Sequence, residues 1–136
     1  MLLKHQADPD VRNFQGNSSV SEAAFYNKID SLQLMLENGG YSNTQNNEDE
    51  TPLFRSAKAS NLEAVEILLQ YNADPDIPDK RGNTPLSEAS GNGNLEIVML
   101  LLTNDASVNL INIDGSGALH QASGAGWNDV VNYLLN

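Results

Sequence analysis

The amino-acid sequence repeats itself at a fixed interval, and no other feature restricts its fold as strongly. Thr51-Pro52-Leu53 returns as Thr84-Pro85-Leu86, and the offset from 51 to 84 is 33 positions. The pairs Leu68-Leu69 and Leu101-Leu102 show the same offset. A period of this length indicates small units that stack side by side, because so short a unit cannot bury its apolar face alone.

The period extends over the whole chain. One step after the two clearest units lies Gly117-Ala118-Leu119, and one step before them lies Ser18-Ser19-Val20. We therefore predict a single domain over 1–136. It divides into a partial unit at 1–12, units at 13–45, 46–78 and 79–111, and a terminal unit at 112–136.

Each unit predicts two helices. Thr51 and Thr84 suit the N-cap, and the proline after each suits the first helical turn, where its missing N–H is not needed. After a turn near 60–61 or 93–94, a second helix follows. The apolar positions at helical spacing predict a buried stripe on both helices, made of Leu53, Ala57, Val65, Leu68 and Leu69 in one unit and Leu86, Ala89, Val98, Leu101 and Leu102 in the next.

After each second helix, we expect one residue in the left-handed conformation. Gly39, Asn72 and Asp105 occupy this position, and Gln6 stands there in the partial unit. Extended hairpin loops follow, in which Asp49 replaces the turn glycine that the other units carry. Ser18-Ser19 and Gly117-Ala118 lack the Thr-Pro start, so we expect their units to be looser.

These motifs together resemble the ankyrin repeat: a Thr-Pro-Leu start, a Val-x-x-Leu-Leu run and an Ala-Asp-x-Asn-like exit, all in a frame of the same length. The resemblance implies an all-α solenoid of helix-turn-helix units joined by β-hairpin-like loops. It also implies a concave binding face made of the hairpin tips and the exposed side of the first helices. Carried over position by position, the partner-binding candidates are Phe14, Gln15, Asn17, Phe25, Tyr26, Asn47, Glu48, Glu50, Lys58, Lys80, Arg81, Asn83, Asn92, Ile113 and Asp114.

Three of these candidates, Phe14, Phe25 and Tyr26, are aromatic residues of the kind that dominate protein interfaces. The alternative is that Phe25 and Tyr26 pack against the preceding unit.

Other positions predict structural contacts. Arg81 is expected to pair with Glu48 or Glu50 across adjacent tips. His120 holds the place of the histidine that follows Thr-Pro-Leu in ankyrin repeats, which implies structural hydrogen bonds to the neighbouring turns. Trp127 is expected to be partly buried against Leu95.

Composition restricts the function. A formal net charge of −11 argues against binding to nucleic-acid phosphates and favours a basic protein or peptide partner, or simply solubility. The chain has no cysteine and two histidines, so no metal site, cofactor site or catalytic constellation is predicted. No apolar run is long enough to span a membrane, and an intracellular location is expected.

Two functional hypotheses follow. The first is a non-enzymatic module that binds a peptide or a folded protein on its concave face. The second is a regulatory or targeting segment of a larger enzyme or of a bacterial or viral effector, with the active site elsewhere. The sequence starts inside a predicted second helix and shows no polar capping unit, which suggests a piece of a longer array or self-association through the solenoid ends.

Overall fold

The computed structural model describes residues 5–136, and in that range it contains eight α-helices and no β-strand. The all-α prediction is therefore confirmed for the part of the chain that is described, and the helix predicted across the first residues lies outside it. The helices are α1 (Ser19–Phe25), α2 (Ile29–Glu37), α3 (Pro52–Lys58), α4 (Leu62–Gln70), α5 (Pro85–Gly91), α6 (Leu95–Thr103), α7 (Ala118–Ala125) and α8 (Asn128–Leu135).

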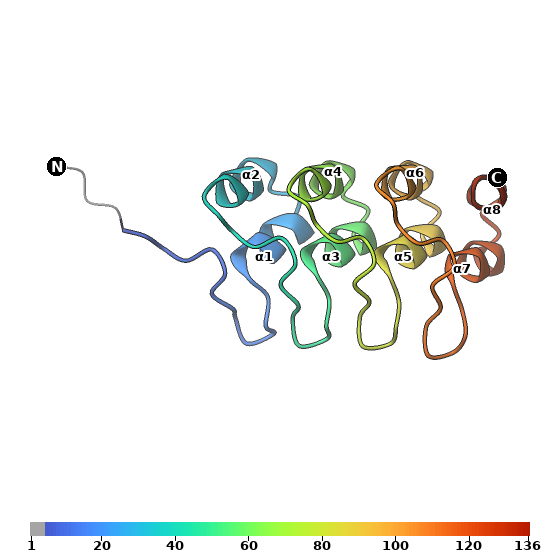
Figure 1. The fold of residues 1–136 in the computed structure, drawn as a ribbon, viewed down its shortest axis with the longest axis horizontal. Coiled ribbons are helices and arrows are strands. Elements are labelled where there is room, and N and C mark those ends of the chain that lie inside the picture. Colours follow the sequence, from blue (N-terminus) through green and yellow to red (C-terminus); the bar gives the residue numbers. More distant parts are fainter. Residues whose placement is uncertain (1–4) are drawn as a thin grey trace.

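The helices form two parallel rows, as Figure 1 shows. The first helices of the units (α1, α3, α5 and α7) pack on one another in chain order, and the second helices (α2, α4, α6 and α8) do the same in the other row. The hairpin loops all extend from the side of the first helices. Each unit therefore contacts only its neighbours, as in other solenoids.

Hydroxyl side chains begin three of the four first helices. Thr51 Oγ1 accepts the Phe54 N–H at 3.0 Å, and Thr84 Oγ1 accepts the Ser87 N–H at 3.2 Å. Both predicted caps are thus confirmed. Ser18 does the same for Ser21 at 3.1 Å although its unit has no Thr-Pro start. A hydroxyl oxygen at this position satisfies a backbone donor that the helix itself leaves unpaired.

The last first helix begins differently, because Gly117 has no side chain to cap it. The His120 ring reaches back, and its Nδ1 accepts the Gly117 N–H at 3.1 Å. His120 therefore makes a structural hydrogen bond, as predicted, but its partner is the start of its own helix.

The predicted apolar stripe forms the core between the two rows. Leu53, Leu68, Val98 and Leu101 are fully buried, and Leu102 is half-buried. The core residues of neighbouring units form one continuous cluster along the stack. The units consequently share their buried surface, which is how a series of short helices reaches a stable core.

The predicted left-handed positions are also confirmed. φ is +57° at Gln6, +88° at Gly39, +65° at Asn72 and +68° at Asp105. Asp49, which replaces a turn glycine, has φ +60°. A non-glycine residue in this conformation costs about 1–2 kcal/mol, so the repeated geometry overrides local preference at these positions.

A candidate protein-interaction surface

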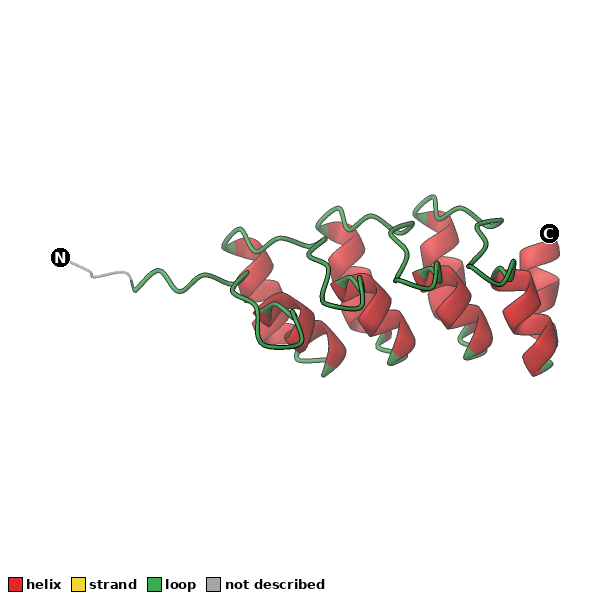
Figure 2. Ribbon diagram, turned by 90° about the horizontal axis from the view of Figure 1, so that it is seen from below, coloured by secondary structure: helices red, strands yellow, loops and turns green. Residues whose placement is uncertain are grey.

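The hairpin tips and the first helices together form one hollowed surface, which we call the hairpin-helix surface. The chain reverses at 14–15, 47–48, 80–81 and 113–114, and the loops follow one another at regular intervals along the stack (Figure 2). Two pockets on this surface are lined jointly by both kinds of element. One, of about 300 Å³, is lined by Phe14, Gln15, Asn17, Asn46, Asn47, Glu48, Glu50 and Arg55. The other, of about 270 Å³, is lined by Asn83, Ser87, Glu88, Gly91, Asn92 and Gln121.

A repeated side-chain contact fixes the shape of each hairpin. Asn46 Oδ1 accepts the backbone N–H groups of Glu48 and Glu50, both at 2.9 Å. The residues one period before and after it, Asn13 and Asp79, make the same pair of bonds in their own hairpins. These short polar side chains satisfy turn N–H groups that would otherwise bond to water.

Adjacent hairpins are joined through their backbones. The Asn47 N–H donates to the Gln15 carbonyl at 3.0 Å, and the Lys80 N–H donates to the Glu48 carbonyl at 3.0 Å. The Ile113 N–H continues the ladder to Arg81 at 2.9 Å. The tips therefore hold a fixed spacing, and the side chains at 15, 48, 81 and 114 are presented from a preformed frame.

Four predicted partner-binding residues hold this frame together. Asn17 is buried, and its Oδ1 accepts a bond from Asn46 at 2.9 Å. The Asn83 Oδ1 accepts the corresponding bond from the next hairpin at 2.9 Å. The amides of Asn47 and Asn92 donate to the carbonyls of earlier units at 2.8 and 3.1 Å. These amides have structural roles that sequence spacing alone did not reveal.

The aromatic candidates differ in exposure. Phe14 is fully exposed at a tip and Tyr26 is 61% exposed, whereas Phe25 is half-buried. The Phe25 ring meets the Tyr26 ring edge-on, with centroids 5.0 Å apart. The Arg55 guanidinium lies 4.4 Å from the Phe25 centroid. Phe25 therefore packs toward the following unit through Arg55, which sits on α3, and a cation over an aromatic face is a favourable contact.

Arg55 is a residue of this surface that the sequence analysis missed. It is buried, its Nη1 donates to the Ser21 carbonyl and hydroxyl at 3.2 and 3.0 Å, and it lies 3.7 Å from the Glu22 carboxylate. The sequence did contain a clue, because Arg55 lies one period after Glu22. Opposite charges at equivalent positions of adjacent units come close together when the units stack.

The charged tips pair differently from our prediction. Arg81 lies 3.6 Å from Asp114 in the following hairpin, not beside Glu48 or Glu50. The Glu50 carboxylate is already bound to Lys58 of its own unit at 3.3 Å. Both partners of the Arg81–Asp114 pair are mostly exposed, so the pair contributes little to stability. Gln15, Glu48, Lys80 and Ile113 have exposed side chains at the tips.

Glu88 is a second residue that the sequence analysis missed. It sits half-buried on α5 among polar groups. Burial is the main cause that raises the pKa of its carboxyl, and nearby Asp79 and Glu50 raise it further, while Lys58 lowers it. Its equivalents in the adjacent units are Arg55 and Gln121, so no repeated motif marks the position.

Trp127 links the last unit to the C-terminal end of α5. Its Nε1 donates to the Gly91 carbonyl at 2.9 Å. Its ring lies directly against Gly93, where an added Cβ would come within 2.4 Å of the ring. We predicted packing against Leu95, and Gly93 is the close contact that the structure shows. A glycine is required there by the ring as well as by its φ of +73°.

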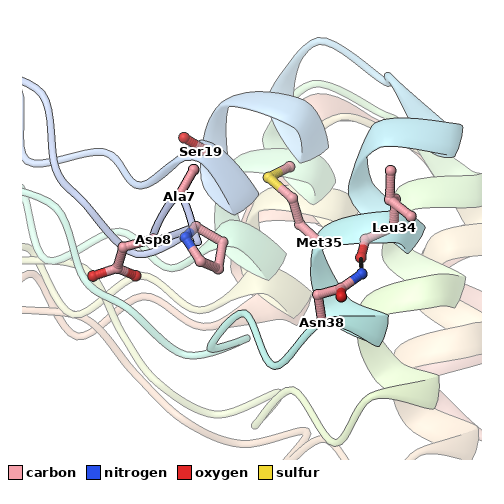
Figure 3. A pocket seen from close by; sticks show the side chains of 7 residues that line it. Ala7, Asp8, Ser19, Leu34, Met35 and Asn38 are labelled. Carbon is pink, nitrogen blue, oxygen red and sulfur yellow. Dashed lines mark hydrogen bonds between the residues drawn. The ribbon is translucent and has the colours of Figure 1, made fainter. Parts of the chain in front are cut away.

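Another pocket lies at the α1–α2 end of the stack and differs in chemistry. Its volume is about 230 Å³, and Leu34 and Met35 supply much of its wall (Figure 3). The Asn38 amide at its rim is bonded to the Leu34 carbonyl at 2.8 Å. Ser19 of α1 also lines this pocket, but none of the hairpin-tip residues does, so the pocket is separate from the two pockets of the hairpin-helix surface.

Residues 5–136 contain no group of three or more His, Cys, Asp or Glu side chains that could hold a metal ion. Within the same residues, no helix has the length and apolar character needed to cross a membrane.

Comparison with known proteins identifies the class. A family model described as Ankyrin repeats (3 copies) matches residues 1–79 and 71–136, which together cover the chain. The chain therefore belongs to the ankyrin-repeat family. Members of this family are generally protein–protein interaction modules and are generally not catalytic.

Particular relatives share part of the array. A segment of 53 residues is 40% identical to neurogenic locus notch homolog protein 1 of Danio rerio, and 38% identical to the proteins of that name from Mus musculus and Homo sapiens. The matched segment is 39% of this chain and 2% of each relative, so the chain spans a small part of the length of these curated proteins.

Proposed function

We propose that this chain binds a protein or peptide partner through the hairpin-helix surface, without catalysing a reaction. The observation that carries the proposal is the fully exposed Phe14 ring at a tip, with the largely exposed Tyr26 ring directly after α1 in the same unit. Large aromatic side chains lose little entropy on binding and supply much of the energy of protein interfaces.

The contrast between repeated and variable positions supports the same proposal. Positions that repeat in every unit build the core and the hairpin ladder. The exposed side chains of the hairpin-helix surface do not repeat: the tips carry Gln15, Glu48, Arg81 and Asp114 in successive units. A rigid frame that presents variable side chains is suited to recognising a partner, because little ordering entropy is lost on binding.

A matched pair of tyrosines provides the test. Tyr26 is 61% exposed on the proposed surface, and Tyr41 is 58% exposed in the loop that follows α2. We expect Tyr26→Ala combined with Phe14→Ala to abolish capture of a specific partner from cells that express the protein, while Tyr41→Ala leaves capture intact. Equal loss in both variants, or retention in the Phe14 and Tyr26 double variant, would refute the assignment of the surface.

The size of the notch relatives favours a second candidate, in which this array is a regulatory or targeting part of a longer protein. The segment that matches them is 2% of their length. Determination of the full coding sequence tests this candidate. A reading frame that adds no further domain would eliminate it, and the interaction proposal would be unaffected.

A further inference from the structure

In a row of equivalent positions, Glu88 is the charged residue that forms no ion pair among residues 5–136. Glu22, Arg55, Glu88 and Gln121 lie one repeat period apart, and they stand on consecutive first helices. Glu22 has the Arg55 guanidinium at 3.7 Å. Among residues 5–136, the ion pairs are those of Arg55, Lys58 and Arg81, and none of them includes Glu88. Its carboxylate likewise has no hydrogen-bond partner within that range.

The cation that acts on Glu88 is already bound to another carboxylate. Lys58 on α3 is bound to the Glu50 carboxylate at 3.3 Å. Burial is the largest cause that raises the pKa of Glu88, Lys58 lowers this pKa, and the like charges of Asp79 and Glu50 raise it further. This half-buried carboxylate therefore lacks the close ion pair that Glu22 receives from Arg55, and only the more distant Lys58 compensates its charge.

The surroundings of Glu88 leave room for a ligand group. The carboxylate lines the pocket of about 270 Å³ with amide and hydroxyl side chains, and it is the only ionisable group in that lining. Gly91 stands where the two preceding units carry Phe25 and Lys58, and the last unit also has a glycine there, Gly124. A Cβ added at Gly91 would meet no atom closer than 3.5 Å, so the missing side chain opens this part of the surface.

We propose that this pocket receives the basic head group of one arginine or lysine side chain from a protein partner. The cation would lie on the Glu88 carboxylate, with its other donors toward the amide oxygens of Asn92 and Gln121. A guanidinium or ammonium group has several donors and no acceptor, and it fits a lining of one carboxylate and several amide oxygens. The inference rests on the proposed function and names the chemistry of the partner at one position.

The test uses short peptides as probes of the whole chain. An acetylated and amidated Gly-Ser-Arg-Ser-Gly peptide is titrated into the ¹⁵N-labelled protein, and lysine and citrulline replace the arginine in two further peptides. We expect the backbone amide signals of Glu88, Gly91 and Gln121 to shift with the arginine or lysine peptide, and not with the neutral citrulline peptide. Equal shifts with citrulline, or shifts confined to other parts of the chain, would overturn the proposal.

Two variants and one control locate the effect. Glu88→Gln should weaken binding of the basic peptides roughly tenfold, since it removes a charge-assisted contact. Gly91→Lys should weaken it similarly, because its ammonium would occupy the pocket as Lys58 serves Glu50. Glu63→Gln makes the same change in net charge at an exposed position of α4 and should have no effect. Binding that is unchanged in both pocket variants, or equally weakened in Glu63→Gln, would contradict the assignment.

The same variants separate this inference from the proposed function. If a cellular partner is lost on combining Phe14→Ala with Tyr26→Ala but retained by Glu88→Gln and Gly91→Lys, the pocket assignment is wrong and the interaction surface stands. If the peptides bind at Glu88 and the aromatic variants retain the partner, the aromatic part of the proposal is wrong.

Discussion

The central units and the last unit carry the same leucines in different surroundings. Leu86 on α5 is 1% exposed, whereas Leu119, at the equivalent position of α7, is 38% exposed. Leu69 on α4 is 9% exposed, and its equivalent Leu135 on α8 is 68% exposed. In the structure, α3 to α6 have units packed on both sides, and α7 and α8 have one neighbour. In this stack, burial is therefore a property of the neighbour as much as of the residue.

The start of the first helix shows the same contrast. Thr84 and Ser87 cap α5 reciprocally: each side chain accepts the backbone N–H of the other residue. The Ser87 hydroxyl, itself buried, also donates to the Thr84 carbonyl at 2.9 Å. In α7 a single bond from the Gly117 N–H to the exposed His120 ring replaces this arrangement. The last unit thus has weaker local support as well as less burial.

The equivalent leucines provide the largest expected difference. Leu86→Ala should lower the free energy of unfolding by about 2–5 kcal/mol, because it leaves a cavity between packed helices. Leu119→Ala should cost roughly 1 kcal/mol, because the side chain is already in contact with water. Urea unfolding followed by circular dichroism measures both. Equal losses would show that the last unit is as well packed as the central ones.

The equivalent glycines at the helix-helix turns sharpen the comparison. Gly93 and Gly126 have φ values of +73° and +80°, so alanine at either should cost about 1 kcal/mol of backbone strain. Gly93→Ala should cost roughly 2 kcal/mol or more in total, because its Cβ would lie 2.4 Å from the Trp127 ring, while nothing lies within 4 Å at Gly126.

Fluorescence provides the readout for these glycine variants, since Trp127 is the sole tryptophan. We expect a changed emission spectrum in Gly93→Ala and an unchanged one in Gly126→Ala. An unaltered spectrum in Gly93→Ala would mean that the Trp127 ring does not rest on this turn.

The helix caps should differ by a smaller amount. Thr84→Ala should destabilise the protein by about 1 kcal/mol, as is usual for loss of an N-cap hydroxyl. His120→Ala should cost roughly half as much, because the exposed imidazole already competes with water for its bond to the Gly117 N–H. Thermal unfolding of the two variants in the same buffer compares them. A larger loss in His120→Ala would indicate that the last unit depends on this single bond.

We expect the smallest change in the free energy of unfolding at Glu88, and this change depends on pH. The raised pKa means that the folded protein holds this proton more tightly than the unfolded chain does. The protonated Glu88 carboxyl therefore contributes its full share to the free energy of unfolding below the ordinary pKa of 4.5. This contribution is lost as the pH rises through the higher pKa of the folded protein.

Glu88→Gln should accordingly match the wild-type stability in acid and exceed it at neutral pH by up to roughly 1 kcal/mol, since partial exposure screens the effect. Denaturation midpoints across this pH range measure the difference, with Glu63→Gln as the control for net charge. A variant that is less stable at neutral pH would show that the carboxylate is favourably paired in solution.

Much of the fold was predictable because its determinants repeat. Thr51 and Thr84 marked helix starts, and Asn72 and Asp105 marked helix ends. The repeating frame placed Gln6 and Asp49 in left-handed conformations that their own chemistry disfavours. One periodic pattern indicated caps, core and turns together, and agreement between these levels is what makes a sequence specify a fold.

For the hairpin-helix surface, the sequence predicted which positions belong to it but not what their side chains contact. The sequence placed Phe14, Tyr26 and the hairpin tips on one face, but it did not separate exposed side chains from those that hold the units together. It assigned Arg81 to Glu48 or Glu50, and the structure pairs Arg81 with Asp114. Which side chains pair across hairpins depends on where each side chain points and on whether its partner is already bound, as Glu50 is by Lys58. The spacing of residues along the chain does not encode either.

The sequence by itself determined the repeating backbone, because each unit carries its own caps, apolar stripe and turn residues within one period. Only the tertiary structure decided which polar groups were satisfied. Arg55 is paired with Glu22, the Asn17 amide lies within the frame, and Glu88 forms no ion pair among residues 5–136. Whether a charge is compensated depends on groups one unit away, and those distances exist only after the units have stacked.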